Sequence, residues 1–267
     1  MRKLLWAIIL LATVQGVQAQ RKNFWSDHTT GDVPNKHQGT ARLSFPTNFK
    51  LYDVDGASMQ GELNTIVDGK GGKRTTITLP NANGGLEDYE LIEASNFEPA
   101  LQAKFPQIRA FTGKSLTDPS AILKLSLSPE GIQGMVLRSD RDDEFIEPYS
   151  ADNKTYSVYR AQRQPGKLPW TCSTMDKGLT ASVNAQVSGT SITGRSGGDL
   201  KTLRLAQSCN GEYANYFKAT TSADVALVLA AFNNTLTRVN GVFEKDLAIH
   251  LNLIAATTNV IYYNPAT

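Results

Sequence analysis

Hydrophobic residues follow their clearest period near the C-terminal end of the chain, where they predict a strand, a long helix and a second strand. Between residues 225 and 243 they recur at steps of three and four, which gives a helix of roughly six turns with one apolar face. Residues 221–224, Thr-Ser-Ala-Asp, can cap the start of this helix. Leu200, Leu203 and Leu205 lie in an extended run, and residues 247–254 alternate with period two, with β-forming residues continuing to 263. This order predicts a βαβ unit with parallel strands.

Between residues 41 and 159 the pattern changes to short, often alternating segments that turn residues separate. The predicted strands are 44–46, 49–54, 75–80, 89–93, 121–127 and 134–137, and a short helix is predicted at 99–105. Asp-Gly, Gly-Gly and Asp-Pro pairs mark the turns. Such a row of short strands is typical of an antiparallel, two-layer β domain. The whole chain is therefore predicted to have an α+β fold, with residues 21–40 as a loose polar leader.

The N-terminus has the pattern of a secretory signal peptide. The positively charged segment 1–3 precedes an apolar run at 4–12, and Val17-Gln18-Ala19 is a small-x-small cleavage site. We therefore expect residues 1–19 to be removed and the protein to be secreted to the extracellular space. The apolar run is too short to span a bilayer, so no membrane association is expected after signal removal. The net charge of +2 gives no indication of a nucleic-acid partner.

A change in composition divides the rest of the chain. Residues 162–199 are rich in Pro, Gly, Ser, Thr and Ala, which predicts a flexible, protease-accessible linker. The domains expected are a β-rich domain at 20–161, this linker, and an incomplete unit at 200–267. Basic residues in or beside the linker offer sites to an activating protease: Arg160, Arg163, Lys167, Lys177 and Arg195. Because two strands do not make a complete domain, we expect the chain to be the front part of something longer.

Several short stretches carry a family resemblance. Leu203-Arg204-Leu205-Ala206, Gly211 to Phe217, Arg238 to Asp246 and Leu253-Ile254 resemble the opening of the catalytic domain in bacterial reprolysin-like zinc metalloproteases, which are metzincins. The β-rich domain is similar to the propeptide of the same precursors. Its matching stretches are Leu79 to Gly85, Phe105 to Ile108, Phe111 to Lys114, Asp118 to Ala121 and Glu147 to Ser150.

The resemblance implies the N-terminal part of a secreted zinc metalloendopeptidase precursor whose propeptide keeps the protease latent. Its reaction is hydrolysis of protein or peptide substrates by a zinc-bound water, and its zinc motif is H-E-x-x-H-x-x-G-x-x-H. This sequence does not contain that motif, so it offers no catalytic residue and the chain alone is expected to be inactive. The alternative is a secreted, non-catalytic binding or adhesion protein with a propeptide-like β domain.

The pattern around the histidines gives little indication of a metal site. His28 and His37 lie in a turn-rich segment without a converging set of ligands, and we expect them to be exposed. Alternation places His250 with Ala248 and Asn252 on the more polar face of a strand, where a structural role is expected.

The cysteines leave three alternatives open. The resemblance implies that Cys172 is a switch cysteine, a metal ligand whose thiolate fills the open zinc position. A disulfide between Cys172 and Cys209 is also natural in an exported protein with two cysteines. The third alternative is two unrelated thiols.

Two other acidic features have competing interpretations. The run Asp140 to Glu144 could bind calcium, but a solvated hairpin end is favoured because the run lacks the glycine and spaced oxygens of a calcium loop. Glu212 and Tyr213 follow the first strand of the predicted βαβ unit, where the resemblance implies a structural or substrate-cleft role.

Overall fold

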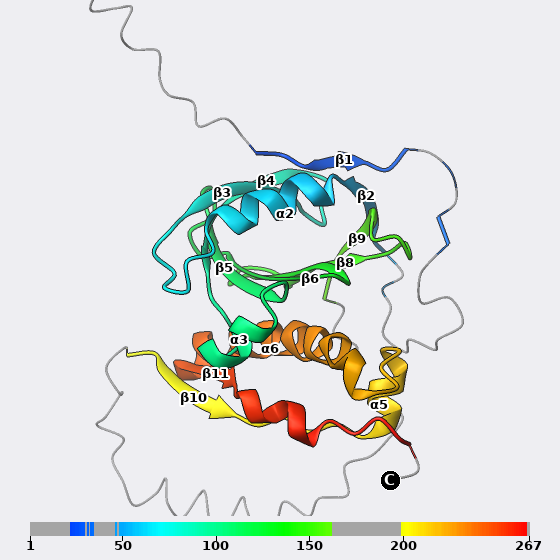
Figure 1. The fold of residues 1–267 in the computed structure, drawn as a ribbon. Coiled ribbons are helices and arrows are strands. Elements are labelled where there is room, and N and C mark those ends of the chain that lie inside the picture. The colour runs from blue at the N-terminus through cyan, green and yellow to red at the C-terminus, as the bar shows by residue number, and fades with distance from the viewer. Residues whose placement is uncertain are drawn as a thin grey trace, which may run out of the picture.

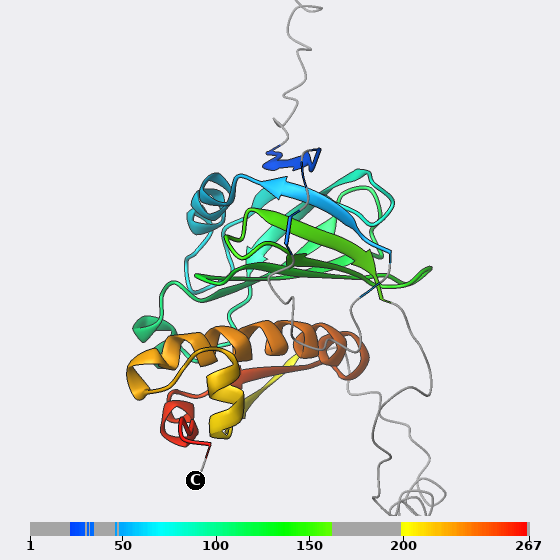
Figure 2. The same ribbon diagram turned by 90° about the vertical axis from the view of Figure 1, so that its right-hand side faces the viewer.

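The computed structural model describes residues 22–29, 31, 33–34, 46, 48–161 and 199–265. The predicted signal peptide, His37, Cys172 and nearly all of the linker lie outside the described residues. Figures 1 and 2 show a curled β-sheet on one side, a smaller α/β unit on the other, and one long helix between them. The α+β fold class is confirmed.

Nine antiparallel strands form the sheet of the front domain, in the order β1-β2-β9-β8-β7-β6-β5-β4-β3. Its strands are β1 (Trp25–Asp27), β2 (Lys50–Val54), β3 (Thr75–Pro80), β4 (Leu86–Glu93), β5 (Arg109–Ser115), β6 (Ile122–Ser128), β7 (Gly131–Leu137), β8 (Glu144–Pro148) and β9 (Thr155–Arg160). Its helices are α2 (Gly56–Thr65) and α3 (Pro99–Lys104).

The sheet curls back on itself rather than forming the two separate layers that were predicted. Asn23 bridges Thr78, and the backbone N–H of Thr78 donates to the carbonyl of Lys22 at 3.1 Å, so the segment before β1 meets β3. Bringing the two edges together satisfies backbone groups that an open sheet would leave exposed. Apolar side chains fill the interior, among them Tyr89 and Phe111, each 1% exposed.

Two parts of the front domain differ from the sequence prediction. Helix α2 replaces the turn expected at Asp55-Gly56. Asp55 caps the start of this helix by accepting a hydrogen bond from the backbone N–H of Ser58 at 3.1 Å. Met59 and Leu63 of the helix are fully buried in the core of the curled sheet. Strand β1 lies in the segment expected to be a loose leader. It is ordered there because Trp25 packs edge-on against Tyr156, with ring centroids 5.2 Å apart.

The C-terminal unit contains the predicted βαβ arrangement. Its elements are β10 (Lys201–Leu205), α5 (Gly211–Tyr216), the 3₁₀ turn η1 (Ser222–Asp224), α6 (Val225–Leu247), β11 (Ile249–Leu253) and the 3₁₀ helix η2 (Ala255–Val260). Strands β10 and β11 pair in parallel, and Thr221 and Asp224 form the predicted capping box. The segment between β10 and η1 contains α5, and the β-forming residues beyond Ile254, which were predicted to continue the strand, form η2.

Helix α6 has two faces of different chemistry. One is the apolar stripe, with Val228, Leu229, Phe232 and Leu236 buried in a core shared with β11 and Ala214 of α5. The other carries polar residues that bond the curled sheet, such as Asn234 and Arg238. Both views show the helix lying against that sheet (Figures 1 and 2). None of the helices within the described residues is long and apolar enough to cross a membrane.

Candidate functional site

The predicted metal ligand Cys172 lies outside the described residues, so its three alternatives stay predictions. Cys209 has no disulfide partner among the described residues; it is half-buried and lies between β10 and α5. Burial raises the pKa of this thiol, which disfavours the reactive thiolate.

The described histidines each have a carboxylate partner. His28 was expected to be exposed, but its side chain is only 12% exposed and its Nδ1 lies 2.9 Å from Asp53 on β2, which the pairing of β1 with β2 brings near. His250 takes the predicted polar position on β11. Its Nδ1 lies 2.7 Å from Glu244, and its Nε2 faces the carbonyl oxygen of Ser95 at 3.1 Å.

The described residues do not fit a zinc ion. No three His, Cys, Asp or Glu side chains in this part of the chain converge on one point where a metal could bind. Each of the two described histidines is instead held by a neighbouring carboxylate, on different elements. We therefore derive no catalytic step from these residues.

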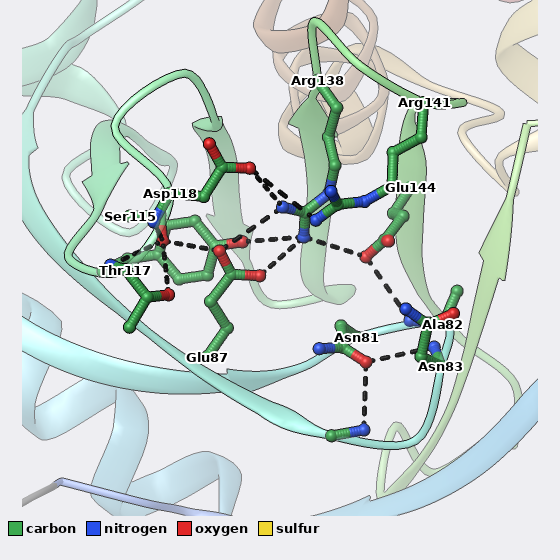
Figure 3. Close-up of polar contacts among 12 residues, drawn as sticks. Asn81, Ala82, Asn83, Glu87, Ser115, Thr117, Asp118, Arg138, Arg141 and Glu144 are labelled. Carbon is green, nitrogen blue, oxygen red and sulfur yellow. Dashed lines mark hydrogen bonds and ion pairs between the residues drawn. The ribbon is translucent and has the colours of Figure 1, made fainter.

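The acidic run after β7 forms the predicted hairpin end, but its last residue is buried rather than solvated. Glu144 opens β8 and is 1% exposed beside Arg138, whose side chain is fully buried (Figure 3). Arg138 Nη2 lies 2.6 Å from Glu87 and 3.3 Å from Glu144, and Nη1 lies 3.3 Å from Asp118. This cluster joins β4, the end of β7, β8 and the β5–β6 loop, which gives it a structural role.

The Arg138 cluster also explains the pKa of Glu87. Burial alone would raise that pKa, but hydrogen bonds from Arg138 and Ser115 outweigh it, and the pKa lies below its ordinary value. The ionised pair is therefore part of the folded front domain.

Tyr213 makes packing contacts, as the structural one of its two expected roles requires. Its ring packs against Phe217 and Phe232 at centroid distances of 5.1 and 5.7 Å. Glu212 lies in the first turn of α5, where a negative charge complements the positive end of the helix dipole.

The site with the most developed chemistry is the contact between the front domain and α6–β11. Asn96, between β4 and α3, is 2% exposed at its centre. Its side-chain NH₂ donates to Asn233 Oδ1 at 2.9 Å and to Thr237 Oγ1 at 2.8 Å, and its Oδ1 accepts from Asn240 at 2.9 Å. Asn240 in turn accepts a hydrogen bond from the backbone N–H of Leu251 on β11 at 2.8 Å. One residue of the front domain thus organises both the helix and the strand.

The same segment adds an isolated parallel bridge to the free edge of the two-stranded β10–β11 sheet. Phe97 forms a parallel bridge with Leu253 of β11. The N–H of Leu253 donates to the carbonyl of Asn96 at 2.7 Å, and the N–H of Glu98 donates to the carbonyl of Leu253 at 3.0 Å. Strand addition of this kind uses main-chain hydrogen bonds for affinity.

Charged pairs flank this centre. Lys124 of β6, only 5% exposed, bonds Glu244 of α6. Further along the helix, Arg238 lies 2.6 Å from Glu147 of β8 and 5.0 Å from the centroid of the Phe145 ring. A cavity of about 10 Å³ between Asn96, Lys124 and His250 has room for one water at most. The contact is therefore a docking surface rather than a substrate pocket.

Glu244 makes this docking surface sensitive to acid. Burial alone would raise its pKa, but the hydrogen bond from His250 and the charge of Lys124 outweigh it, and the pKa lies below the ordinary value of 4.5. Because its pKa is lower in the folded state, ionised Glu244 stabilises the folded protein above pH 4.5. This stabilisation is lost as the pH falls through the folded-state pKa.

We expect Glu244→Gln to lower the free energy of unfolding at pH 7 by about 1–3 kcal/mol, because it leaves Lys124 buried without a counter-charge. The deficit relative to the unchanged protein should shrink as the pH falls below 4.5, as urea unfolding at several pH values can show. Glu130→Gln, at an exposed turn between β6 and β7, is the matched control and should change little at any pH. A deficit independent of pH would contradict the assignment.

No curated protein and no solved structure matches the chain. One family model does match, over about a quarter of the sequence. Residues 200–267, which include all of α6 and β11, match the metallo-peptidase family M12B, reprolysin-like, and this match supports a metalloprotease family for the parent protein.

Proposed function

We propose that this chain is the N-terminal portion of a secreted zinc metalloendopeptidase precursor, in which residues 20–161 are the propeptide that keeps the protease latent. The observation that carries the proposal is the docking surface. The front domain supplies Asn96 and Phe97 to the unit that matches the metallopeptidase family. A domain that completes the sheet and helix packing of a protease unit is well placed to control it.

The remaining parts of the proposal come from the sequence. Residues 1–19 would direct export to the extracellular space, and residues 162–199 would be the place where an activating protease cuts. The M12 family uses zinc in general, and the ligands would lie outside the described residues, with Cys172 as the thiolate that blocks the metal. The substrate would be a protein or peptide.

The test is to express the complete gene product and to measure its zinc content and peptide hydrolysis before and after cleavage in the linker. We expect one bound zinc, little hydrolysis before cleavage, and hydrolysis that a chelator abolishes afterwards. Residues 20–267 alone should be inactive. A gene product without zinc would contradict the proposal and would favour the non-catalytic binding protein.

Cys172→Ala separates the switch from a purely steric block. If the thiolate occupies the zinc, the uncut variant should hydrolyse peptides at least about tenfold faster than the uncut parent, since the fourth zinc position is then open to water. Cys209→Ala is the matched control and should not raise activity. Equal activation by both variants would favour a disulfide between the two cysteines over the switch.

A further inference from the structure

We propose that the front domain, residues 22–161, stays bound to residues 199–265 after the linker between them is cut. A segment that we call the clip, residues 95–108, holds it there. The inference rests on the proposed function in one respect, because it takes the linker as the place of processing. It adds that this cut does not release the front domain and that a second step must follow.

The clip belongs to the front domain by sequence and to the C-terminal unit by packing. It leaves the curled sheet at the end of β4 and returns to it at β5. Its apolar residues Phe97, Leu101 and Ile108 are 3%, 0% and 1% exposed, and they lie in the core of α6 and β11 rather than in the core of the curled sheet. Cutting the linker changes none of these contacts, so the apolar anchor remains.

The backbone of the clip is tied to β11 on both sides of Phe97. The two hydrogen bonds to Leu253 continue the parallel sheet, and Leu253 is itself fully buried. Separation would leave the N–H and C=O of Leu253 without these partners at the edge of β11. Water can replace these partners, but an intramolecular hydrogen bond is modestly favoured over bonds to water, and this favours the bound state.

Asn96 makes the contact specific. Three side chains of α6 bond its amide group, and those side chains are 1–4% exposed. Burial shields these bonds from bulk water while the domains are together, and every one of them is broken on release. A shifted register between the clip and the helix would leave several polar groups buried and unpaired.

The rest of the docking surface is polar, so the front domain and the C-terminal unit can stay folded apart from each other once a second step has separated them. Besides the charged pairs, Ser126 of β6 donates to Asn234 of α6 at 2.6 Å, and Asn233 donates to the carbonyl of Arg109 at 2.9 Å. Water can solvate all these groups once they are exposed. The apolar clip therefore supplies the affinity, and the polar face keeps both parts soluble after they separate. Cleavage within the clip would be an effective second step.

The experiment places a specific protease site between Gln162 and Pro169 of the full chain, so that both cysteines stay on one fragment and no disulfide can join the two. After complete cleavage, the fragments are passed through a size-exclusion column at about 1 µM. We expect them to elute together and to separate only in denaturant. Two separate peaks under native conditions would overturn the proposal.

Glu98 offers a matched pair of variants that isolates the strand addition. Its backbone φ of −58° suits proline, so Glu98→Pro removes the N–H that bonds Leu253 without straining the chain. Glu98→Ala keeps that N–H and removes only the side chain, which pairs with the exposed Arg204. After cleavage, Glu98→Pro should release its partner on the order of tenfold faster than Glu98→Ala. Equal release rates would show that the strand addition does not hold the fragments.

Asn96→Ala tests the polar centre in the same assay. Its fragments should bind on the order of 100-fold more weakly than the parent's, because several buried bonds to α6 are lost. Circular dichroism before cleavage shows whether the Asn96→Ala variant folds. If it does not fold, the comparison of Glu98→Pro with Glu98→Ala tests the proposal in its place. Elution is independent of zinc and hydrolysis, so this inference and the proposed function can fail separately.

Discussion

Arg138→Met should lower the free energy of unfolding of the front domain by about 3–5 kcal/mol. Arg138 is fully buried and is the positive charge to which Glu87, Glu144 and Asp118 all bond. Burial alone would lower its pKa, but the hydrogen bond that Arg138 donates to Glu87 and the surrounding negative charges outweigh it and raise the pKa. Methionine fills much of the space yet leaves Glu87 and Glu144 buried without a counter-charge, which is the costly case. Urea unfolding monitored by circular dichroism measures the loss.

Two further variants show whether charge is the reason. Arg141→Met removes a neighbouring arginine whose side chain is 33% exposed and whose partners are Asp140 and Asp118, and it should cost about 1 kcal/mol or less. Adding Glu87→Gln to Arg138→Met should recover part of the stability, because one uncompensated charge is removed. If Arg138→Met were as stable as the unchanged protein, the cluster would not support the fold.

Gly211→Ala should destabilise the C-terminal unit by about 3 kcal/mol or more. A β-carbon at Gly211 would lie 2.3 Å from the carbonyl carbon of Asn264 and 2.4 Å from the nitrogen of Pro265. Both are backbone atoms, so they cannot rotate away as the end of a flexible side chain can. Either α5 or the segment after η2 must therefore move, and the loss is measurable by urea unfolding.

The matched control for this steric effect is Gly61→Ala. Gly61 lies inside α2 and is exposed, and no atom lies within 4 Å of the β-carbon it would gain. Alanine in a helix interior is favoured over glycine by about 0.5–1 kcal/mol, so this variant should be slightly more stable than the unchanged protein. Equal effects of the two substitutions would contradict the steric argument.

The elements that the sequence predicted well are those whose signals are local. Strand β3 spans the predicted residues 75–80, and the capping box at Thr221 leads into a helix of 23 residues with the predicted apolar stripe. Helix α2 lacks such a signal, because only Met59 and Leu63 of its ten residues are buried and two glycines lie in its span. It forms because the curled sheet has room in its core for those two side chains.

The candidate site could not be predicted for a related reason. Asn96 is bonded to residues 137, 141 and 144 positions later in the chain, and nothing in its neighbourhood marks it. The polar face of α6 can be read from the sequence, and so can Glu244 in its last turn, but neither indicates a partner. Only the position of the front domain shows what these polar groups bind.

The strand addition at Phe97 also bears on how the chain avoids aggregation. The edge of β11 next to Leu253 carries hydrogen-bonding groups that would otherwise be open to pairing with another molecule. While the front domain lies on that edge, a second copy has no place to pair there. The chain is therefore protected at this edge once its own residues 96–98 have docked.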